Sequence, residues 1–368
     1  MSDKPQSPGE RIRQLLKDRE WTQAELGAVL GLPGSRVTEL VQNKKVIDPE
    51  LAIKLSEAFI STTPREWMEL DAEYRLSLVS KGDGAVRRRA SMLELAPVRE
   101  MESRGWIQKT STPEELEVEL RRFFDTDTLD PPPSLFAATR KTDSIDDLTP
   151  IQRAWCFQVR RIAKNQLVTP YSEDRMPECI KALRKLAAFP QEARKVSNVL
   201  SEYGIRFVIV APIASCKIDG VAMWLDDTSP VIGMSVRFDR IDSFWFTLFH
   251  ELSHIQHRDA LSVDDNLVGA EAFAIERPAI EQRANKEASK MLIETEVLDS
   301  FIKRVSPLYS KDRINQFARK VQIHPGIVVG QLQHRAEIGF HANKEMLVKV
   351  RDIVVATSVT DGWGQIIG

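Results

Sequence analysis

The sequence is poor in cysteine, with only Cys156, Cys179 and Cys216 among 368 residues and no CxxC pair. An odd, scattered set argues against a disulfide framework and for a reducing compartment, so we expect a cytoplasmic protein with small, buried thiols. Long hydrophobic runs are also missing, because stretches such as 207–212 are far too short to span a bilayer. The first ten residues lack the basic and apolar regions of a signal peptide. We therefore expect no membrane partner.

An excess of charge of either sign is absent as well. The 51 Lys and Arg residues against 53 Asp and Glu residues give a net charge of -2, which is no global signature for nucleic acid. Hydrophobic residues make up 42% and charged residues 28%, as in ordinary globular proteins. The length predicts two or three domains.

Helical periodicity dominates the chain, and only three β-type runs interrupt it, at about 205–210, 221–225 and 231–236. This ordering predicts a mostly α protein with a small β-sheet, of α+β class. Pro131-Pro132-Pro133 is a stiff interruption and a plausible boundary. We expect four parts: an all-α domain at 1–72, a helical middle region at 73–189, an α+β domain at 190–340 and a C-terminal extension at 341–368.

Short helices with clear N-terminal caps fill the first 70 residues. Thr22 caps a helix that ends at Gly31, and a third helix starts near Pro33. The stretch from Thr22 to Leu40 resembles the Cro/repressor class of helix-turn-helix proteins, and the region up to Leu70 resembles HigA-type antitoxins. The resemblance implies that the third helix enters the major groove of DNA.

The expected DNA contacts are polar residues on and around that third helix. Arg36 can pair bidentately with guanine, and Gln23 can reach a phosphate or adenine. Lys44 and Lys45 can contact the DNA backbone. The full set is Gln23, Ser35, Arg36, Thr38, Lys44 and Lys45. Residues 1–70 contain ten Lys and Arg residues against eleven Asp and Glu residues, which is a poor balance for binding phosphates. A protein-interaction module on the same fold therefore stays open as an alternative.

A second chemical signal is the segment 246–254, which contains an HExxH motif. His250 and His254 are one helical turn apart, so both imidazoles can meet one metal ion. Glu251 is placed to contact a water molecule on that metal rather than to ligate it. This is the arrangement of zinc peptidases, with the glutamate as general base.

A catalytic zinc ion needs a third protein ligand and one open position. Glu281, on a predicted helix over 278–293, is our candidate, and Asn285 one turn later is expected to orient a ligand histidine. Ala284 and Ala288 would let this helix pack closely. The rival carboxylates are Asp259, Asp264, Asp265, Glu271, Glu276 and Glu287.

Residues 190–335 resemble the ImmA/IrrE family of metallopeptidases. The matching pieces are Gly204-Ile205-Arg206, Asp219-Gly220-Val221, the HExxH segment, Glu281 to Asn285, and the segment 323–333. The resemblance implies a zincin-like fold with His250, His254 and Glu281 as zinc ligands and Glu251 as the catalytic base. The sequence departs from the family at 286–293, which leaves the helix end and the cleft wall open.

Two further expectations concern the reaction itself. An oxyanion-stabilising group is required, and His257, Tyr309 and His324 are the available candidates. The run 221–225 is our candidate for an edge strand that pairs with a substrate peptide.

Together these patterns predict a homodimeric, DNA-binding regulator with zinc-dependent endopeptidase activity. The resemblance implies a protein substrate, such as a repressor or antitoxin, in a stress, phage-related or toxin-antitoxin setting. The alternatives are a HigA-like antitoxin or autorepressor whose peptidase-like domain only binds or senses a partner, and a housekeeping peptidase with an idle helix-turn-helix.

Overall fold

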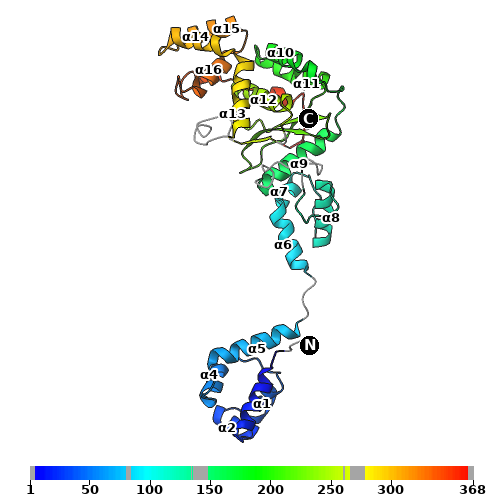
Figure 1. Cartoon of the computed structure of the whole chain (residues 1–368), viewed down its shortest axis with the longest axis vertical. Helices are drawn as coiled ribbons and strands as arrows, with labels where there is room; N and C mark the ends of the chain where they lie inside the picture. The colour runs from blue at the N-terminus through cyan, green and yellow to red at the C-terminus, as the bar shows by residue number, and fades with distance from the viewer. Residues whose placement is uncertain are drawn as a thin grey trace. The chain divides into compact units, whose positions relative to one another are not determined.

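The computed structural model describes residues 5–79, 84–133, 135, 148–259, 262–265 and 278–363. The chain forms two compact units, Met1–Arg87 and Arg88–Gly368 (Figure 1). The described part is mainly helical and contains one five-stranded sheet, which confirms the mostly α fold with a small β component. None of its helices combines the length and the hydropathy that crossing a bilayer requires.

The first unit is all-helical. Its helices are α1 (Pro8–Asp18), α2 (Gln23–Leu30), α3 (Gly34–Val41), α4 (Pro49–Ala58) and α5 (Pro64–Leu78). Ser7, Thr22, Asp48 and Thr63 each accept a backbone hydrogen bond that caps the following helix. Gly31 ends α2 in the left-handed conformation (φ 65°), which turns the chain into α3 at little cost for a residue without a Cβ.

The apolar stripes of these helices meet in one core. Leu26 and Leu30 from α2 pack with Val37 and Leu40 from α3, and the helices on either side complete the cluster. The polar face of α3 is consequently left at the surface. This core holds the geometry that a recognition helix needs.

The second unit surrounds the sheet with helices. Its helical elements are α6 (Ala85–Leu95, which begins just before the division), α7 (Val98–Ser103), α8 (Pro113–Phe124), α9 (Pro150–Lys164), η1 (Glu173–Arg175), α10 (Met176–Leu186), η2 (Pro190–Lys195), α11 (Val196–Glu202), α12 (Ile241–Gln256), α13 (Ala279–Leu292), α14 (Thr295–Val305), α15 (Lys311–Val321), α16 (Pro325–His334), η4 (Lys344–Met346) and α17 (Arg351–Val355). Its strands are β1 (Arg206–Ile209), β2 (Ile218–Trp224), β3 (Pro230–Met234), β4 (Ser262–Asp265) and β5 (Val359–Thr360).

The sheet is mixed, with strand order β4-β2-β3-β1-β5. Strand β1 runs parallel to β3 and β5, whereas β2 runs antiparallel to β3 and β4. The expectation that the run 221–225 forms an edge strand is wrong, because β2 is paired on both sides. Strand β4, which follows α12 in the chain, occupies that edge instead.

Each face of the sheet carries its own core. Ala222 and Ile232 face the cluster that contains α12, whereas Val221 and Val231 face the cluster that contains α9. The alternation follows from the two-residue period of a strand. Helix α12, which carries the HExxH motif, is therefore pressed against one face of the sheet.

The division of the chain differs from the expected ranges. Helix α5 continues to Leu78, so a boundary at 72 would cut it. The range 88–163 is not a separate middle region, because α7, α8 and α9 share a core with β1, β2 and β3. Pro131-Pro132-Pro133 lies inside the second unit and not between the two units. The range 341–368 also belongs to this unit and supplies β5 to its sheet.

Candidate metal centre and helix-turn-helix surface

Helix α3 presents the expected DNA-contacting residues to solvent. Ser35, Arg36 and Thr38 are exposed on it, and Gln23 is exposed at the start of α2. The Thr38 hydroxyl donates to the Gly34 carbonyl oxygen at 3.0 Å, which leaves its methyl group for contacts outside the helix. Lys44, just after α3, is also exposed.

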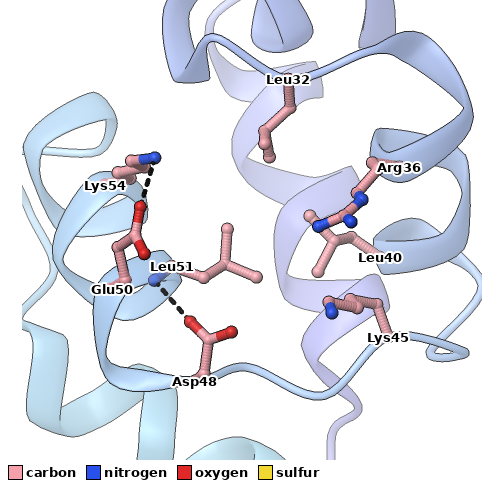
Figure 2. A pocket seen from close by; sticks show the side chains of 8 residues that line it. All are labelled: Leu32, Arg36, Leu40, Lys45, Asp48, Glu50, Leu51 and Lys54. Atoms are coloured by element: carbon pink, nitrogen blue, oxygen red, sulfur yellow. Dashed lines mark hydrogen bonds and ion pairs between the residues drawn. The ribbon is translucent and has the colours of Figure 1, made fainter.

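A small groove runs between α3 and α4 (Figure 2). Arg36 and Lys45 lie on its α3 side, and Lys54 lies on its α4 side, where it is paired with Glu50 at 2.8 Å. Neither Arg36 nor Lys45 forms an ion pair with any described residue. Two cations beside the recognition helix are thus available to an anionic ligand.

Helix α12 positions the metal-ligand candidates of the second unit. It is buried almost along its whole length, and His250, Glu251 and His254 are each 0% exposed. The one-turn spacing places both imidazoles on the same side, as the motif predicts. Burying polar side chains without partners costs free energy, so these three side chains need compensating interactions.

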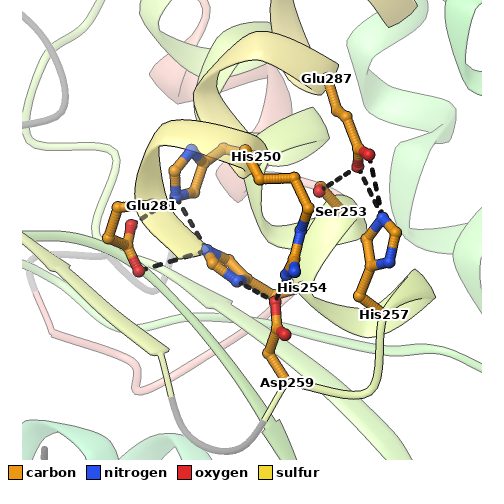
Figure 3. A network of polar contacts seen from close by, with 8 residues as sticks. His250, Ser253, His254, His257, Asp259, Glu281 and Glu287 are labelled. Atoms are coloured by element: carbon orange, nitrogen blue, oxygen red, sulfur yellow. Dashed lines mark hydrogen bonds and ion pairs between the residues drawn. The ribbon is translucent and has the colours of Figure 1, made fainter. Parts of the chain in front are cut away.

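Three potential ligand atoms converge at this point (Figure 3). His250 Nε2 lies 3.0 Å from His254 Nε2 and 3.1 Å from Glu281 Oε2, and His254 Nε2 lies 3.7 Å from Glu281 Oε1. Ligands about 2.1 Å from a tetrahedral zinc ion are separated by roughly 3.4 Å. The three atoms therefore have the spacing and the donor chemistry of a zinc site.

Asp259 determines which nitrogen of His254 can face a metal. Its Oδ2 lies 2.8 Å from His254 Nδ1, so that nitrogen donates its hydrogen and Nε2 keeps a lone pair. Arg283 in turn donates to Asp259 Oδ2. The Nε2 lone pair of His254 therefore points toward His250, 3.0 Å away, on the side where the candidate ligand atoms converge.

Helix α13 brings the third candidate ligand, Glu281. Ala284 and Ala288 are both 0% exposed at its contact with α12, and their small size lets the two helices approach closely, as expected. Glu281 keeps 16% of its side chain exposed, which makes it the most accessible of the three ligands.

A second contact fixes the same two helices. Ser253 Oγ donates to Glu287 Oε2 at 2.5 Å, and His257 Nε2 lies 3.0 Å from both Glu287 oxygens (Figure 3). Glu287 thus joins α12 to α13 about two turns from Glu281. This contact helps to set the register in which Glu281 meets the histidines.

Comparison with known proteins bears on the first unit. A helix-turn-helix family model matches residues 12–67. Residues 12–67 therefore form a helix-turn-helix domain. Virulence-associated protein A of Dichelobacter nodosus is 38% identical over 56 residues, which are 15% of this chain and 55% of that protein. Virulence-associated protein A′ of the same organism is 31% identical over 77 residues, which are 21% of this chain and 67% of that protein.

The chain spans only about half the length of the first of these relatives. Neither comparison matches the ImmA/IrrE family or another peptidase family. The helix-turn-helix domain is thus assigned by family, whereas the site in the second unit stands on its geometry.

The rival carboxylates have other partners or lie outside the described residues. Asp259 is hydrogen-bonded to His254, and Glu287 is hydrogen-bonded to Ser253 and His257. Glu271, Glu276 and the side chains of Asp264 and Asp265 lie outside the described part of the chain. Among the described carboxylates, Glu281 alone joins both histidines in a metal-binding group.

Two supporting residues differ from the expectation. Asn285 makes no hydrogen bond to either histidine within the described part of the chain, and Asp259 makes the contact expected of Asn285.

Gly220 on β2 lies in one of the motifs, but the sequence alone assigns it no role. A Cβ there would lie 2.1 Å from Glu251 Oε1 and 2.9 Å from Thr247 Cγ2, so glycine is what admits the carboxylate between α12 and the sheet.

The three oxyanion candidates are engaged away from the ligand atoms. His257 pairs with Glu287, and the Tyr309 hydroxyl donates to Glu337 Oε2 at 2.6 Å. His324 caps α16 by accepting the Gly326 N–H at Nδ1, 3.1 Å away, and burial lowers its pKa. Each of these side chains is thus engaged in a contact within the fold.

The three cysteines are buried thiols, as expected. Burial raises the pKa of Cys179 to about 12 and that of Cys216 to about 11, and it raises the pKa of Cys156 well above the usual range. They are protonated at neutral pH and carry no nucleophilic chemistry there.

Proposed function

We propose that this protein is a DNA-binding regulator with zinc-dependent endopeptidase activity. The observation that carries the peptidase part is the convergence of His250 Nε2, His254 Nε2 and the Glu281 carboxylate beside the buried Glu251. Two neutral imidazoles and one carboxylate are a common donor set for a catalytic zinc ion that keeps one position open.

The residues of the chain have distinct tasks in this mechanism. When zinc is bound, it supplies Lewis acidity that lowers the pKa of water and polarises the scissile carbonyl. Glu251 accepts the proton of the attacking water and then donates it to the leaving amine nitrogen. Asp259 holds the imidazole of His254 in place, and Arg283 holds Asp259. Burial of Glu251 keeps bulk water away from the transferred proton.

The DNA-binding part rests on the helix-turn-helix family and on the exposed face of α3. Arg36 is the base-reading candidate, and Gln23, Ser35, Thr38, Lys44 and Lys45 are the supporting contacts. Two recognition helices of a homodimer would read a palindromic site one helical turn apart. The protein substrate would be a repressor or an antitoxin.

The test combines metal analysis with proteolysis. The purified chain should contain about one zinc ion, and His250→Ala should lose it, because two ligands remain. Glu251→Gln should keep zinc and fold but lose cleavage of the substrate, since an amide cannot take up the proton. Stoichiometric zinc in both His250→Ala and His254→Ala, or full cleavage by Glu251→Gln, would refute the assignment.

A non-catalytic, HigA-like antitoxin or autorepressor is the second candidate. The observation that favours it is that the family model matches residues 12–67, in the helix-turn-helix domain, and that no peptidase family matches. In that case the second unit binds zinc or a partner without turnover. Wild-type protein loaded with zinc that cleaves no neighbouring gene product, yet binds one of them, would support this candidate.

A further inference from the structure

Three consecutive arginines at the start of α6 have no role in the function proposed above. Arg87, Arg88 and Arg89 are all exposed, and none forms an ion pair with any described residue. No acidic residue occurs between Ala85 and Leu93. The result is a local concentration of three uncompensated positive charges.

The other end of the helix is anchored. Met92 and Leu95 are 4% and 8% exposed and belong to the core that includes α7, α8 and α9. The arginines therefore project from an ordered helix and do not lie on a solvated coil. Because their backbone is already ordered in a helix, less conformational entropy is lost on binding.

Helix stability does not explain this placement. A cation in the first turn of a helix opposes the helix dipole, so Arg87, the third residue of α6, does not stabilise the helix in this way. A helix of this composition would be more stable with acidic residues there. Binding an anion would give the three arginines a role, and arginine suits phosphate because its guanidinium offers a fork of donors.

The helix-turn-helix domain has no net positive charge to attract DNA from a distance. Residues 1–70 hold ten basic and eleven acidic residues, so phosphates meet little net attraction. The chain from Leu78, at the end of α5, to Ala85 can extend at most about 25 Å. The arginines thus begin nine residues after Leu78 and are close in sequence to the domain that contains α3.

We propose that Arg87, Arg88 and Arg89 form a phosphate-binding site that binds the DNA backbone next to the operator. The proposal rests on the DNA-binding function and adds to it a contact that is independent of sequence. It assigns the base readout to α3 and much of the electrostatic affinity to α6.

The test measures how the affinity of the full chain for duplex DNA depends on salt. Each lost phosphate contact lowers the slope of log Kd against log salt by about 0.9. The triple variant R87Q/R88Q/R89Q should therefore lose about 2–3 units of slope, equally on a selected operator and on a random duplex. The matched control is K303Q/R319Q/K320Q, which removes the same charge from exposed sites on α14 and α15 and should keep the slope.

Arg36→Ala separates this proposal from the underlying one. If wild-type protein binds a selected duplex and Arg36→Ala weakens that binding, DNA recognition by α3 holds. A triple variant that then keeps the wild-type slope overturns the phosphate site alone. A slope lost equally in the control variant overturns it too, because general charge would then be responsible. Absence of duplex binding by the wild type would overturn both proposals.

Discussion

Gly220 leaves so little space between β2 and Glu251 that a single methyl group decides whether the carboxylate fits. In Gly220→Ala the new Cβ would meet Glu251 Oε1 at 2.1 Å, so the carboxylate must move. We expect this variant to keep zinc, to lose most proteolysis, and to lose about 1–3 kcal/mol of unfolding free energy from overpacking. Gly339→Ala is the control, because nothing lies within 4 Å of its Cβ. Wild-type cleavage by Gly220→Ala would show that Glu251 need not occupy its observed position.

In the proposed zinc site, Asp259 acts through His254. Its carboxylate fixes the ring and its tautomer, and Arg283 keeps that carboxylate in place. Removal of such a partner commonly lowers metal affinity 10–100-fold. Asp259→Ala should show this loss in zinc competition with a chelator, without any assay of activity. Asp299→Ala removes an exposed carboxylate that pairs with Arg335, and it should leave zinc affinity unchanged. Equal affinities in the two variants would remove Asp259 from the site.

Residue spacing alone was enough to predict the two histidines and Glu251, because a helix fixes which side chains share a face. Asp259 could not be distinguished from other carboxylates in the same way. It follows the end of α12, where the backbone no longer repeats, so its direction depends on how the chain turns after His257. Asn285 has the correct helical spacing from Glu281, but spacing within α13 does not determine which residue reaches His254.

At the scale of elements, local signals predicted the helices well where a capping residue marks the start. Thr22, Thr63, Thr112 and Thr149 each form a capping box at the start of a helix. Helix α14 begins without a side-chain cap, so no capping signal marks its start. Strands β4 and β5 were missed because they are short and are stabilised by pairing with distant segments. The core that residues 88–163 share with the sheet also depends on contacts between distant segments, so local signals did not predict it.

The start of α16 should respond to pH through His324. Its neutral Nδ1 accepts the Gly326 N–H, and burial lowers its pKa below 6.5. The unfolded chain therefore binds the proton more readily, so stability falls as pH decreases from about 6.5 through the lower folded pKa. Asparagine caps helices without titrating in this range. His324→Asn should thus lose less urea resistance between pH 7.5 and pH 5 than the wild type does. Parallel pH profiles of the urea midpoint would contradict this role of His324.

At the scale of the whole molecule, the division into Met1–Arg87 and Arg88–Gly368 assigns the two proposed activities to separate units. The metal ligands, Glu251 and Asp259 all belong to the second unit, and its cores include no residue before Met92. A chain that lacks residues 1–79 should therefore fold and bind about one zinc ion. Its cleavage of substrate supplied in excess should match that of the full chain.

Selectivity in cells should depend on the missing domain. If the substrate is a repressor or antitoxin held near the same DNA, tethering raises its effective concentration at the peptidase site. The chain that lacks residues 1–79 should then cleave its natural target more slowly in cells, whereas the full chain should lose the same advantage when the chromosomal operator is deleted. The matched control is full-length Arg36→Ala, which keeps both units but weakens operator recognition. Cleavage at the wild-type rate by the truncated chain, with and without the operator, would show that DNA binding and proteolysis are independent activities of one polypeptide.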